Sequence, residues 1–220
     1  MVRAADLARR DPQSISLIAV SKTFGVEHVT AAASAGQLDF GENRVQEAIG
    51  KIDATGPLGL RWHLVGHLQS NKARKAAERF AWIHSIDSAD LLRRVEMAAA
   101  EAGTAPRLLV QVDLAGEPTK HGARPEELDA ILAAARDCQA AHVVGLMLLP
   151  PLFDDPERTR PYFRQLRRVR DDLAGRGVPG SMLAQLSMGM SHDFEVAIQE
   201  GATMVRIGTA IFGERPPPLG

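Results

Sequence analysis

Lys22 stands directly after a stretch that is typical of a buried strand. Leu17 to Val20 form a continuous apolar run, the pattern of a strand covered on both faces, and Ser21 and Lys22 follow at once. A lysine there can be a counter-ion for a phosphate. When it is partly desolvated, its pKa falls and the free amine can form a Schiff base with an aldehyde. Of the 26 basic residues only five are lysines: Lys22, Lys51, Lys72, Lys75 and Lys120.

Two segments near the C-terminus have the residue types that bind phosphate. LSMGMSHD and RIGTAIFG each place a glycine and a hydroxyl residue where a strand is expected to turn into a helix. Glycine lets the backbone approach an anion, and the N–H groups of a helix start supply donors. Relief of turn strain by Gly189 and Gly208, or capping by Thr209, would also explain either segment alone. Two such loops side by side favour an anion site.

Alternating strand and helix patterns must position these residues. Apolar runs predict eight strands, and alanine-rich segments with helical periodicity lie between them. The predicted strands cover residues 16–20, 37–40, 61–65, 81–86, 107–114, 142–149, 181–187 and 203–208. The pattern predicts an α/β protein, a single (β/α)8 TIM-type barrel. An open doubly wound sheet is the alternative.

A closed barrel would bring the lysine and the phosphate loops together. Polar residues gather after the predicted strands, which is where barrels of this kind carry their sites. Closure sets the first strand beside the eighth, so that Lys22 faces the loops of Gly189 and Gly208. A phosphorylated aldehyde satisfies both features, and pyridoxal 5′-phosphate (PLP) is such a cofactor.

Five motifs in order resemble one family. The chain resembles the PLP homeostasis proteins in the motifs LIAVSKT, FGENRVQE, WHLVGHLQSNK, LSMGMSHD and MVRIGTAIFG. The single domain of that family is a barrel similar to the N-terminal domain of alanine racemases (fold type III). The motifs run from about residue 15 to residue 213. The segment before the first strand is shorter than this family usually carries.

The resemblance implies a role for each matching position. Lys22 would be the Schiff-base lysine, and Asn43 would lie near the cofactor ring. Arg206 would lie close to the pyridine nitrogen and, being charged, would keep that nitrogen unprotonated. The phosphate would be bound by the remaining matching residues, namely Ser187, Met188, Gly189, Gly208 and Thr209.

The resemblance further implies a cofactor carrier that helps to control PLP levels, with no catalytic turnover. Alanine racemases use a second, β-rich domain and a tyrosine from it as the opposite-face base. We expect no second β domain here, and the only tyrosine, Tyr162, falls in a predicted helix far from the site. The alternatives are a racemase-like PLP enzyme acting on a small amino acid, and a barrel enzyme for another phosphorylated metabolite. Expected partners are PLP and PLP-dependent apo-enzymes as recipients.

Composition sets further bounds. With 45% hydrophobic residues and a net charge of -1, the chain lacks a nucleic-acid or membrane footprint. One cysteine, Cys138, indicates a reducing compartment and a packing role, and no apolar run is long enough to span a membrane. We expect a cytoplasmic monomer with one domain over residues 1–220, a leading helix at 1–12 and an extended tail at 214–220.

Other candidate sites are weaker. His63 and His67 are four residues apart but straddle a predicted strand end, so that even with His84 on the next strand no metal site is expected. The arginines of YFRQLRRVRDDL are expected on a solvated helix face, partly paired with Asp171 and Asp172. The polar segment GHLQSNK has no assigned chemistry: the roles of Gln69 and Asn71 stay open, and Lys72 or Lys120 would assist cofactor transfer.

Overall fold

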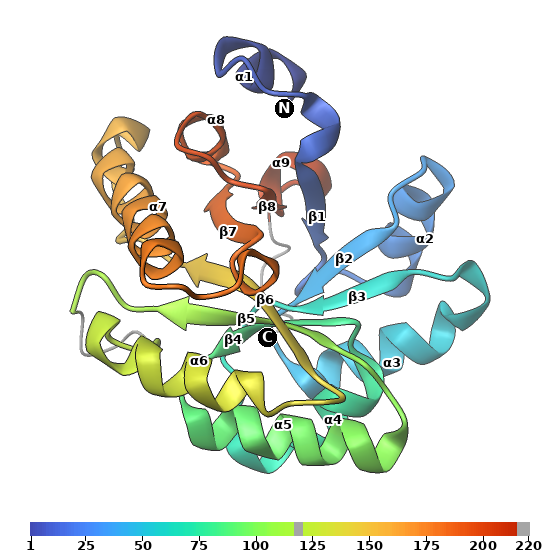
Figure 1. Cartoon of the computed structure of the whole chain (residues 1–220). Coiled ribbons are helices and arrows are strands. Elements are labelled where there is room, and N and C mark those ends of the chain that lie inside the picture. The colour runs from blue at the N-terminus through green and yellow to red at the C-terminus, as the bar shows by residue number, and fades with distance from the viewer. Residues whose placement is uncertain (117–120, 215–220) are drawn as a thin grey trace.

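Eight parallel strands close into a barrel in the computed structural model, which describes residues 1–116 and 121–214. The strand order follows the sequence from β1 to β8, and β8 pairs back onto β1 (Figure 1). The predicted closed barrel is therefore confirmed, and the open sheet is excluded. The strands are β1 (Ser16–Val20), β2 (Asp39–Glu42), β3 (Arg61–Leu64), β4 (Trp82–Ile86), β5 (Arg107–Val112), β6 (His142–Leu148), β7 (Gln185–Met190) and β8 (Met204–Ile207).

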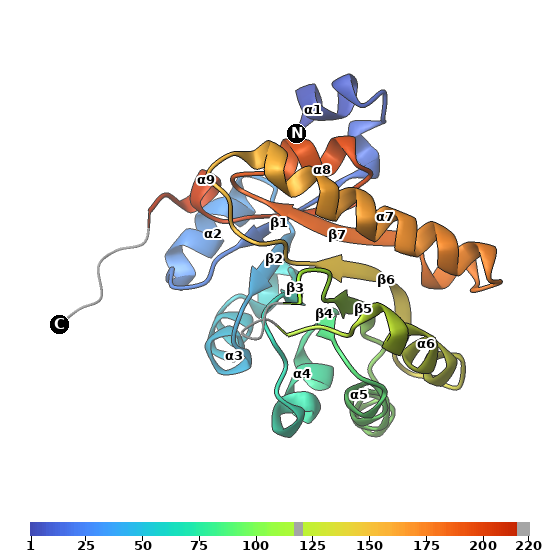
Figure 2. The same ribbon diagram turned by 90° about the vertical axis from the view of Figure 1, so that its left-hand side faces the viewer.

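Helices form a layer around the strands, as Figures 1 and 2 show from two directions. The helices are α1 (Val2–Leu7), α2 (Val26–Ser34), α3 (Val45–Ala54), α4 (Ala73–Arg79), α5 (Ala89–Ala102), α6 (Leu128–Arg136), α7 (Arg160–Gly175), α8 (Phe194–Gln199) and α9 (Thr209–Phe212). Local sequence sets several of their ends. The Ser88 hydroxyl accepts from the Leu91 N–H at the start of α5, and Gly103 ends that helix at a φ of 67°. None of the described helices is long and apolar enough to cross a membrane.

The barrel has two apolar cores. The larger one fills the layer between the strands and the helices and includes Phe40, Leu92 and Phe163. A smaller one lies inside the barrel, where Ile18, Trp82, Leu109, Met147 and Met204 pack together. Because successive strand residues point to opposite sides, alternate residues of each strand fill this interior. Arg206 is two residues after Met204 and therefore points into the barrel as well.

The seventh strand differs from its prediction. It was expected at 181–187 and lies at Gln185–Met190. The apolar run before it ends in a 3-10 helix, Gly180–Met182, and the strand continues through Gly189 at a φ of +94°. Glycine adopts that conformation without strain, so a residue that usually marks a strand end lies within this strand. Ser187 is therefore in mid-strand, and Ser191 is the serine at its carboxyl end.

The arginines of α7 differ from expectation too. Arg160, Arg164 and Arg167 contact one carboxylate, that of Glu200, whose side chain is 5% exposed. Arg170 pairs with Asp171, as the sequence suggested. The arginine-rich face of α7 therefore binds the end of α8, and only part of it is an independent solvated surface.

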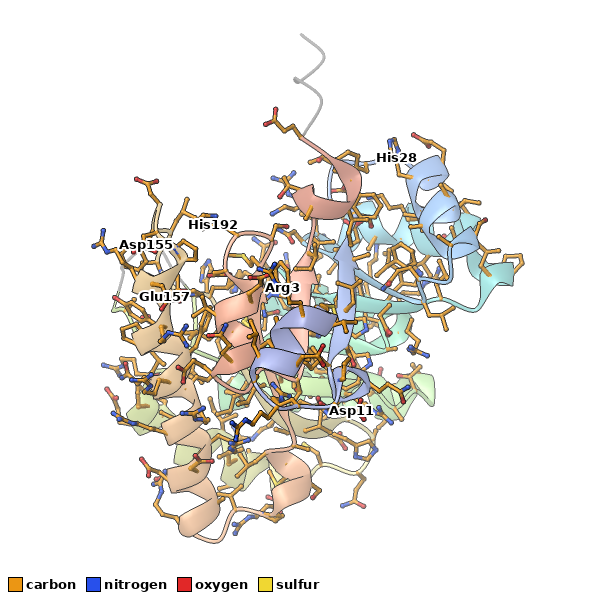
Figure 3. The ribbon with its side chains drawn as sticks, turned by 90° about the horizontal axis from the view of Figure 1, so that it is seen from above. Arg3, Asp11, His28, Asp155, Glu157 and His192 are labelled. Atoms are coloured by element: carbon orange, nitrogen blue, oxygen red, sulfur yellow. The ribbon has the colours of Figure 1, made fainter. Side chains whose placement is uncertain are left out.

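The N-terminal segment packs onto α8. The Arg10 guanidinium donates to the carbonyl oxygens of Ile198 and Ala202, at 2.9 and 2.7 Å. The expected leading helix at 1–12 is shorter, Val2–Leu7, and a 3-10 turn at Pro12–Ser14 leads into β1. Arg3 and Asp11 mark this segment in Figure 3. Most of the expected extended tail, 215–220, lies outside the described residues.

Candidate functional site

Lys22 stands at the carboxyl end of β1, next to the end of β8. The register pairs Ala19 with Ile207, and a Cβ on Gly208 would lie only 3.3 Å from the Val20 carbonyl oxygen. The loop after Lys22 reaches α9, since the rings of Phe24 and Phe212 have centroids 5.3 Å apart. The turn that carries Lys22 and the loop of Gly208 therefore lie side by side, as the closed barrel predicts.

Thr23, the residue after Lys22, has a strained backbone. Its φ is +71°, a conformation that β-branched residues rarely adopt. The Thr23 N–H donates to Glu47 Oε1 at 2.7 Å, which holds the turn in place. Such strain is common at functional sites, and here the Glu47 hydrogen bond holds the strained turn that carries the lysine.

A buried ion pair supports this turn from the outer side of the barrel. Lys51 of α3 donates to Glu42 Oε1 at 2.6 Å and to the Ser21 carbonyl oxygen at 2.8 Å, and the Ser21 hydroxyl donates to the same Glu42 oxygen. Burial raises the pKa of Glu42. The hydrogen bonds from Lys51 and Ser21 lower it, but the effect of burial is larger. Lys51 is 6% exposed and is paired with Glu42, so it is a structural residue of the outer layer.

Arg206 lies inside the barrel near its carboxyl end. The residue is 4% exposed, and its guanidinium donates to the Ser187 hydroxyl at 2.6 Å and to the Leu148 carbonyl oxygen at 2.9 Å. Burial lowers the pKa of Arg206 to about 10, and nearby Asp193 acts in the opposite direction. The arginine is therefore charged at neutral pH.

The two predicted phosphate loops contact each other. The Gly208 N–H donates to the Ser191 hydroxyl at 3.1 Å. Gly189 packs against α8 so closely that a Cβ there would lie 2.5 Å from that of Ala197. Asp193 closes the turn after β7 by accepting from the Met190 N–H at 2.7 Å. At the end of this turn His192 contacts the Asp154 carbonyl oxygen, next to Asp155 and Glu157 (Figure 3).

Two of the predicted phosphate residues are placed differently. The hydroxyl of Ser187 is fully buried in the barrel and contacts Arg206 and His84, so it does not face the loops. Met188 is also fully buried and packs in the outer core. Ser191, which the sequence analysis does not name, directly follows the last residue of β7. It is the second serine of LSMGMS and lies beyond the strand end because β7 continues to Met190.

Asn43 follows β2 at the rim and is held by the next loop. A Cβ on Gly66 would lie 2.3 Å from the Asn43 carbonyl oxygen, so the GEN and VGH segments touch backbone to backbone. Glycine at position 66 is what allows this approach. Two sequence motifs that looked independent therefore form one structural unit.

Other expected participants lie elsewhere. Asn71 lines a surface groove between α4 and α5 with Arg94 and Met97. Gln69 precedes a short 3-10 turn, Ser70–Lys72, and Lys120 lies outside the described residues. Tyr162 stands in the first turn of α7, where its ring lies 6.1 Å from that of Phe153 and packs on the outer core. Tyr162 is therefore nearer the carboxyl end of the barrel than expected, but it lies outside the ring of strands.

A second histidine cluster stands at the rim. His67, Asp87 and His121 bring their ligand atoms within 4.8 Å of one another. The two imidazoles are stacked, with centroids 3.5 Å apart and planes within 10°. Because a ring nitrogen binds a metal in its own plane, two parallel rings cannot direct their lone pairs at one ion. The cluster is not arranged as a metal site.

Comparison with known proteins identifies the family. The sequence profile described as "Alanine racemase, N-terminal domain" matches residues 3–216. The protein of Aquifex aeolicus named "Pyridoxal phosphate homeostasis protein" is 41% identical over 97% of this chain and 92% of its own length. The protein of the same name from Pseudomonas aeruginosa is 43% identical, over 96% of this chain and 90% of its own. The chain belongs to the pyridoxal phosphate homeostasis protein family.

Solved structures agree with this family assignment. PipY of Synechococcus elongatus, solved with PLP bound, has a TM-score of 0.86 and 44% identity, covering 96% of this chain and 99% of its own. An alanine racemase from Clostridium difficile has a TM-score of 0.74 at 17% identity, with 59% of its chain covered. The racemase shares the fold alone, whereas PipY is a relative over its whole length.

Proposed function

We propose that this protein binds PLP at the carboxyl end of the barrel and helps to control the level of the free cofactor. The observation that carries the proposal is the closure of β8 onto β1, which brings the lysine turn, the buried arginine and the two glycine loops to one place. The relatives named for pyridoxal phosphate homeostasis and the PLP-bound PipY structure support it.

The residues present fit this cofactor. A charged guanidinium buried inside the barrel suits a neutral ring nitrogen, and backbone approach at Gly208 suits a phosphate. When bound, PLP supplies an aldehyde that condenses with a primary amine and releases one water. Lys22 would supply that amine, with Asn43 near the ring and Arg206 at its nitrogen.

The phosphate cradle is assigned from both loops. We assign it to Ser191, Gly208 and Thr209, with the backbone near Gly189. Ser191 enters this set because its hydroxyl already accepts from the Gly208 N–H. Ser187 and Met188 leave the set because both are fully buried, one beneath the arginine and one in the outer core. Ser187 acts instead on Arg206.

Absorption spectroscopy with chemical trapping tests the proposal. PLP is added to the purified protein, the visible spectrum is recorded, and borohydride then fixes the cofactor for peptide mapping. We expect a new visible band and the label on Lys22. Lys22→Ala should lose both, whereas Lys75→Ala, a change of an exposed lysine on α4, should keep both. Absence of a band, or a label on Lys75, would refute PLP binding at this site.

We further propose that the loaded protein is a carrier without turnover, working as a cytoplasmic monomer that passes PLP to apo-enzymes. The one tyrosine, Tyr162, packs outside the strand ring and is therefore not placed as an opposite-face base. The loaded protein should exchange no α-proton of L-alanine in deuterated water and should restore activity to a PLP-free enzyme. Exchange that disappears in Lys22→Ala would establish an enzyme. Light scattering tests the expected mass of 23.7 kDa.

A further inference from the structure

A row of polar side chains crosses the inside of the barrel beneath Arg206. The Ser187 hydroxyl, which accepts from Arg206, lies 2.9 Å from His84 Nδ1. His84 Nε2 lies 3.0 Å from His63 Nδ1, and His63 Nε2 lies 3.0 Å from Asp39 Oδ1. The row starts near the carboxyl end of β8 and ends at the first residue of β2.

The far end of the row is an ion pair at the amino end of the barrel. Asp39 accepts two hydrogen bonds from Arg61, at 2.7 and 2.6 Å. Burial acts to raise the pKa of Asp39, but the hydrogen bonds from Arg61 and His63 outweigh it and lower the pKa to about 2. At neutral pH Asp39 is therefore ionised and can only accept hydrogen bonds.

When both imidazoles are neutral, the two ends fix the direction of every hydrogen bond between them. Arg206 can only donate, so the Ser187 hydroxyl accepts from it. The same hydroxyl then donates its own hydrogen bond to His84 Nδ1. A neutral imidazole that accepts at Nδ1 donates from Nε2, so His84 donates to His63 and His63 donates to Asp39. Within the row, Ser187, His84 and His63 then each donate one hydrogen bond and accept one.

A charged His63 is the competing arrangement, and burial opposes it. An imidazolium at His63 would reverse the middle of the row and leave the Ser187 proton without a partner there. Burial lowers the pKa of His63, against the effect of Asp39, and lowers that of His84 well below its usual value. An imidazolium at His63 would also be repelled by Arg61, and one at His84 by Arg206.

We propose that Ser187, His84 and His63 form a one-way hydrogen-bond chain that joins Arg206 to Asp39 and holds the arginine in place. Within the described residues Arg206 makes no ion pair, so the chain gives its guanidinium a connection to a negative charge. The three are positioning residues, because they act on the site through Arg206. This role rests on the proposed function, whereas the chain itself can be tested without any ligand.

Nitrogen NMR on the ligand-free protein tests the direction. Five of the seven histidines are exposed, namely His28, His67, His121, His142 and His192, and single changes of these to glutamine leave the signals of His63 and His84 identified by elimination. Both buried rings should carry their proton on Nε2 alone and stay neutral from pH 6 to 8. A doubly protonated His63, or a proton on Nδ1 of His84, would overturn the chain.

A serine pair provides the matched variant and control. Ser187→Ala removes the link next to Arg206, so His84 Nδ1 loses its donor and we expect its nitrogen shifts to change. Ser85→Ala is the control, because Ser85 is equally buried and its hydroxyl has no partner among the described residues. Unchanged His84 signals in Ser187→Ala, or an equal change in Ser85→Ala, would refute the link.

The loaded protein tests the positioning role. In Ser187→Ala the pH midpoint of the visible PLP band should move, and in Ser85→Ala it should match the original. A midpoint that stays put in Ser187→Ala would overturn the positioning role. If the unmodified protein takes up no PLP, the proposed function fails, and the NMR measurement still decides whether the chain exists.

Discussion

Lys51 of α3 and Glu42 of β2 form an ion pair with 2.6 Å between Nζ and Oε1, and both side chains are almost closed to solvent. A buried ion pair adds little net stability, but removal of one partner leaves an uncompensated charge. Lys51→Met should therefore lower the free energy of unfolding by about 3 kcal/mol or more. Urea denaturation measures this loss.

The double variant Glu42→Gln with Lys51→Met should recover part of that stability, because no buried charge remains. The control pair is Arg74 and Glu78, one helical turn apart and exposed on α4. Arg74→Met should cost about 0–1 kcal/mol. Equal losses in the buried and the exposed pair would contradict the account.

The ion pair of Asp39 predicts a pH dependence of stability. Its hydrogen bonds lower the pKa of Asp39 in the folded protein to about 2, against an ordinary value of 3.8 for an aspartate. A lowered folded pKa stabilises the protein above the unfolded pKa, and this contribution disappears as the pH falls from about 5 toward 2. Asp39→Asn should cost about 2 kcal/mol at pH 7 and progressively less toward pH 3.

Unfolding in urea between pH 3 and 7 gives this profile. Asp53→Asn is the control, because Asp53 pairs with Arg79 but its side chain is 59% exposed. A difference between Asp39→Asn and the original protein that stays constant over this range would show that the Asp39 carboxylate keeps its ordinary pKa.

Gly66 and Gly50 should respond oppositely to alanine. At Gly66 a Cβ would lie 2.3 Å from the Asn43 carbonyl oxygen, so Gly66→Ala should cost about 1–3 kcal/mol and weaken PLP binding by displacing Asn43. Nothing lies within 4 Å of the same position at Gly50 in α3. Gly50→Ala should stabilise the protein by about 0.5–1 kcal/mol. Thermal unfolding and PLP titration of both variants test this contrast, and it fails if the two behave alike.

Cys138 should react slowly in the folded protein. Burial, with Glu96 and Asp137 nearby, raises the pKa of its thiol to about 11. Because the thiolate is the reacting form, alkylation by iodoacetamide at pH 8 should be roughly a hundredfold slower than in the urea-unfolded chain. Similar rates in the two states would show an accessible, reactive thiol.

The barrel could be predicted from the sequence because its strands are short, apolar and separated by helical segments. The first strand was placed at the observed residues, 16–20. The seventh strand was misplaced since Gly189, a residue that usually marks a turn, lies inside it. Because the strand was placed too early, Ser187 was expected at its carboxyl end, where Ser191 lies instead.

The interior contacts could not be predicted, because they join residues far apart in the sequence. His84 and Ser187 are 103 residues apart, and nothing in either local segment indicates that they meet. Lys51 looked like an ordinary surface residue of an amphipathic helix, and only packing against β1 and β2 shows its carboxylate partner. Local sequence patterns predict the helices and strands, whereas the contacts between polar side chains depend on residues that are distant in the sequence.

The pairing of β1 with β8 also sets an order of events during synthesis. Ile18 is the register partner of Arg206, so one half of the proposed PLP site is translated near the start of the chain and the other near its end. Contacts between such distant segments form late, after most of the chain has left the ribosome. A nascent chain that already contains Lys22 has no place to hold a ligand. Ligand uptake would therefore report that the ring of strands has closed.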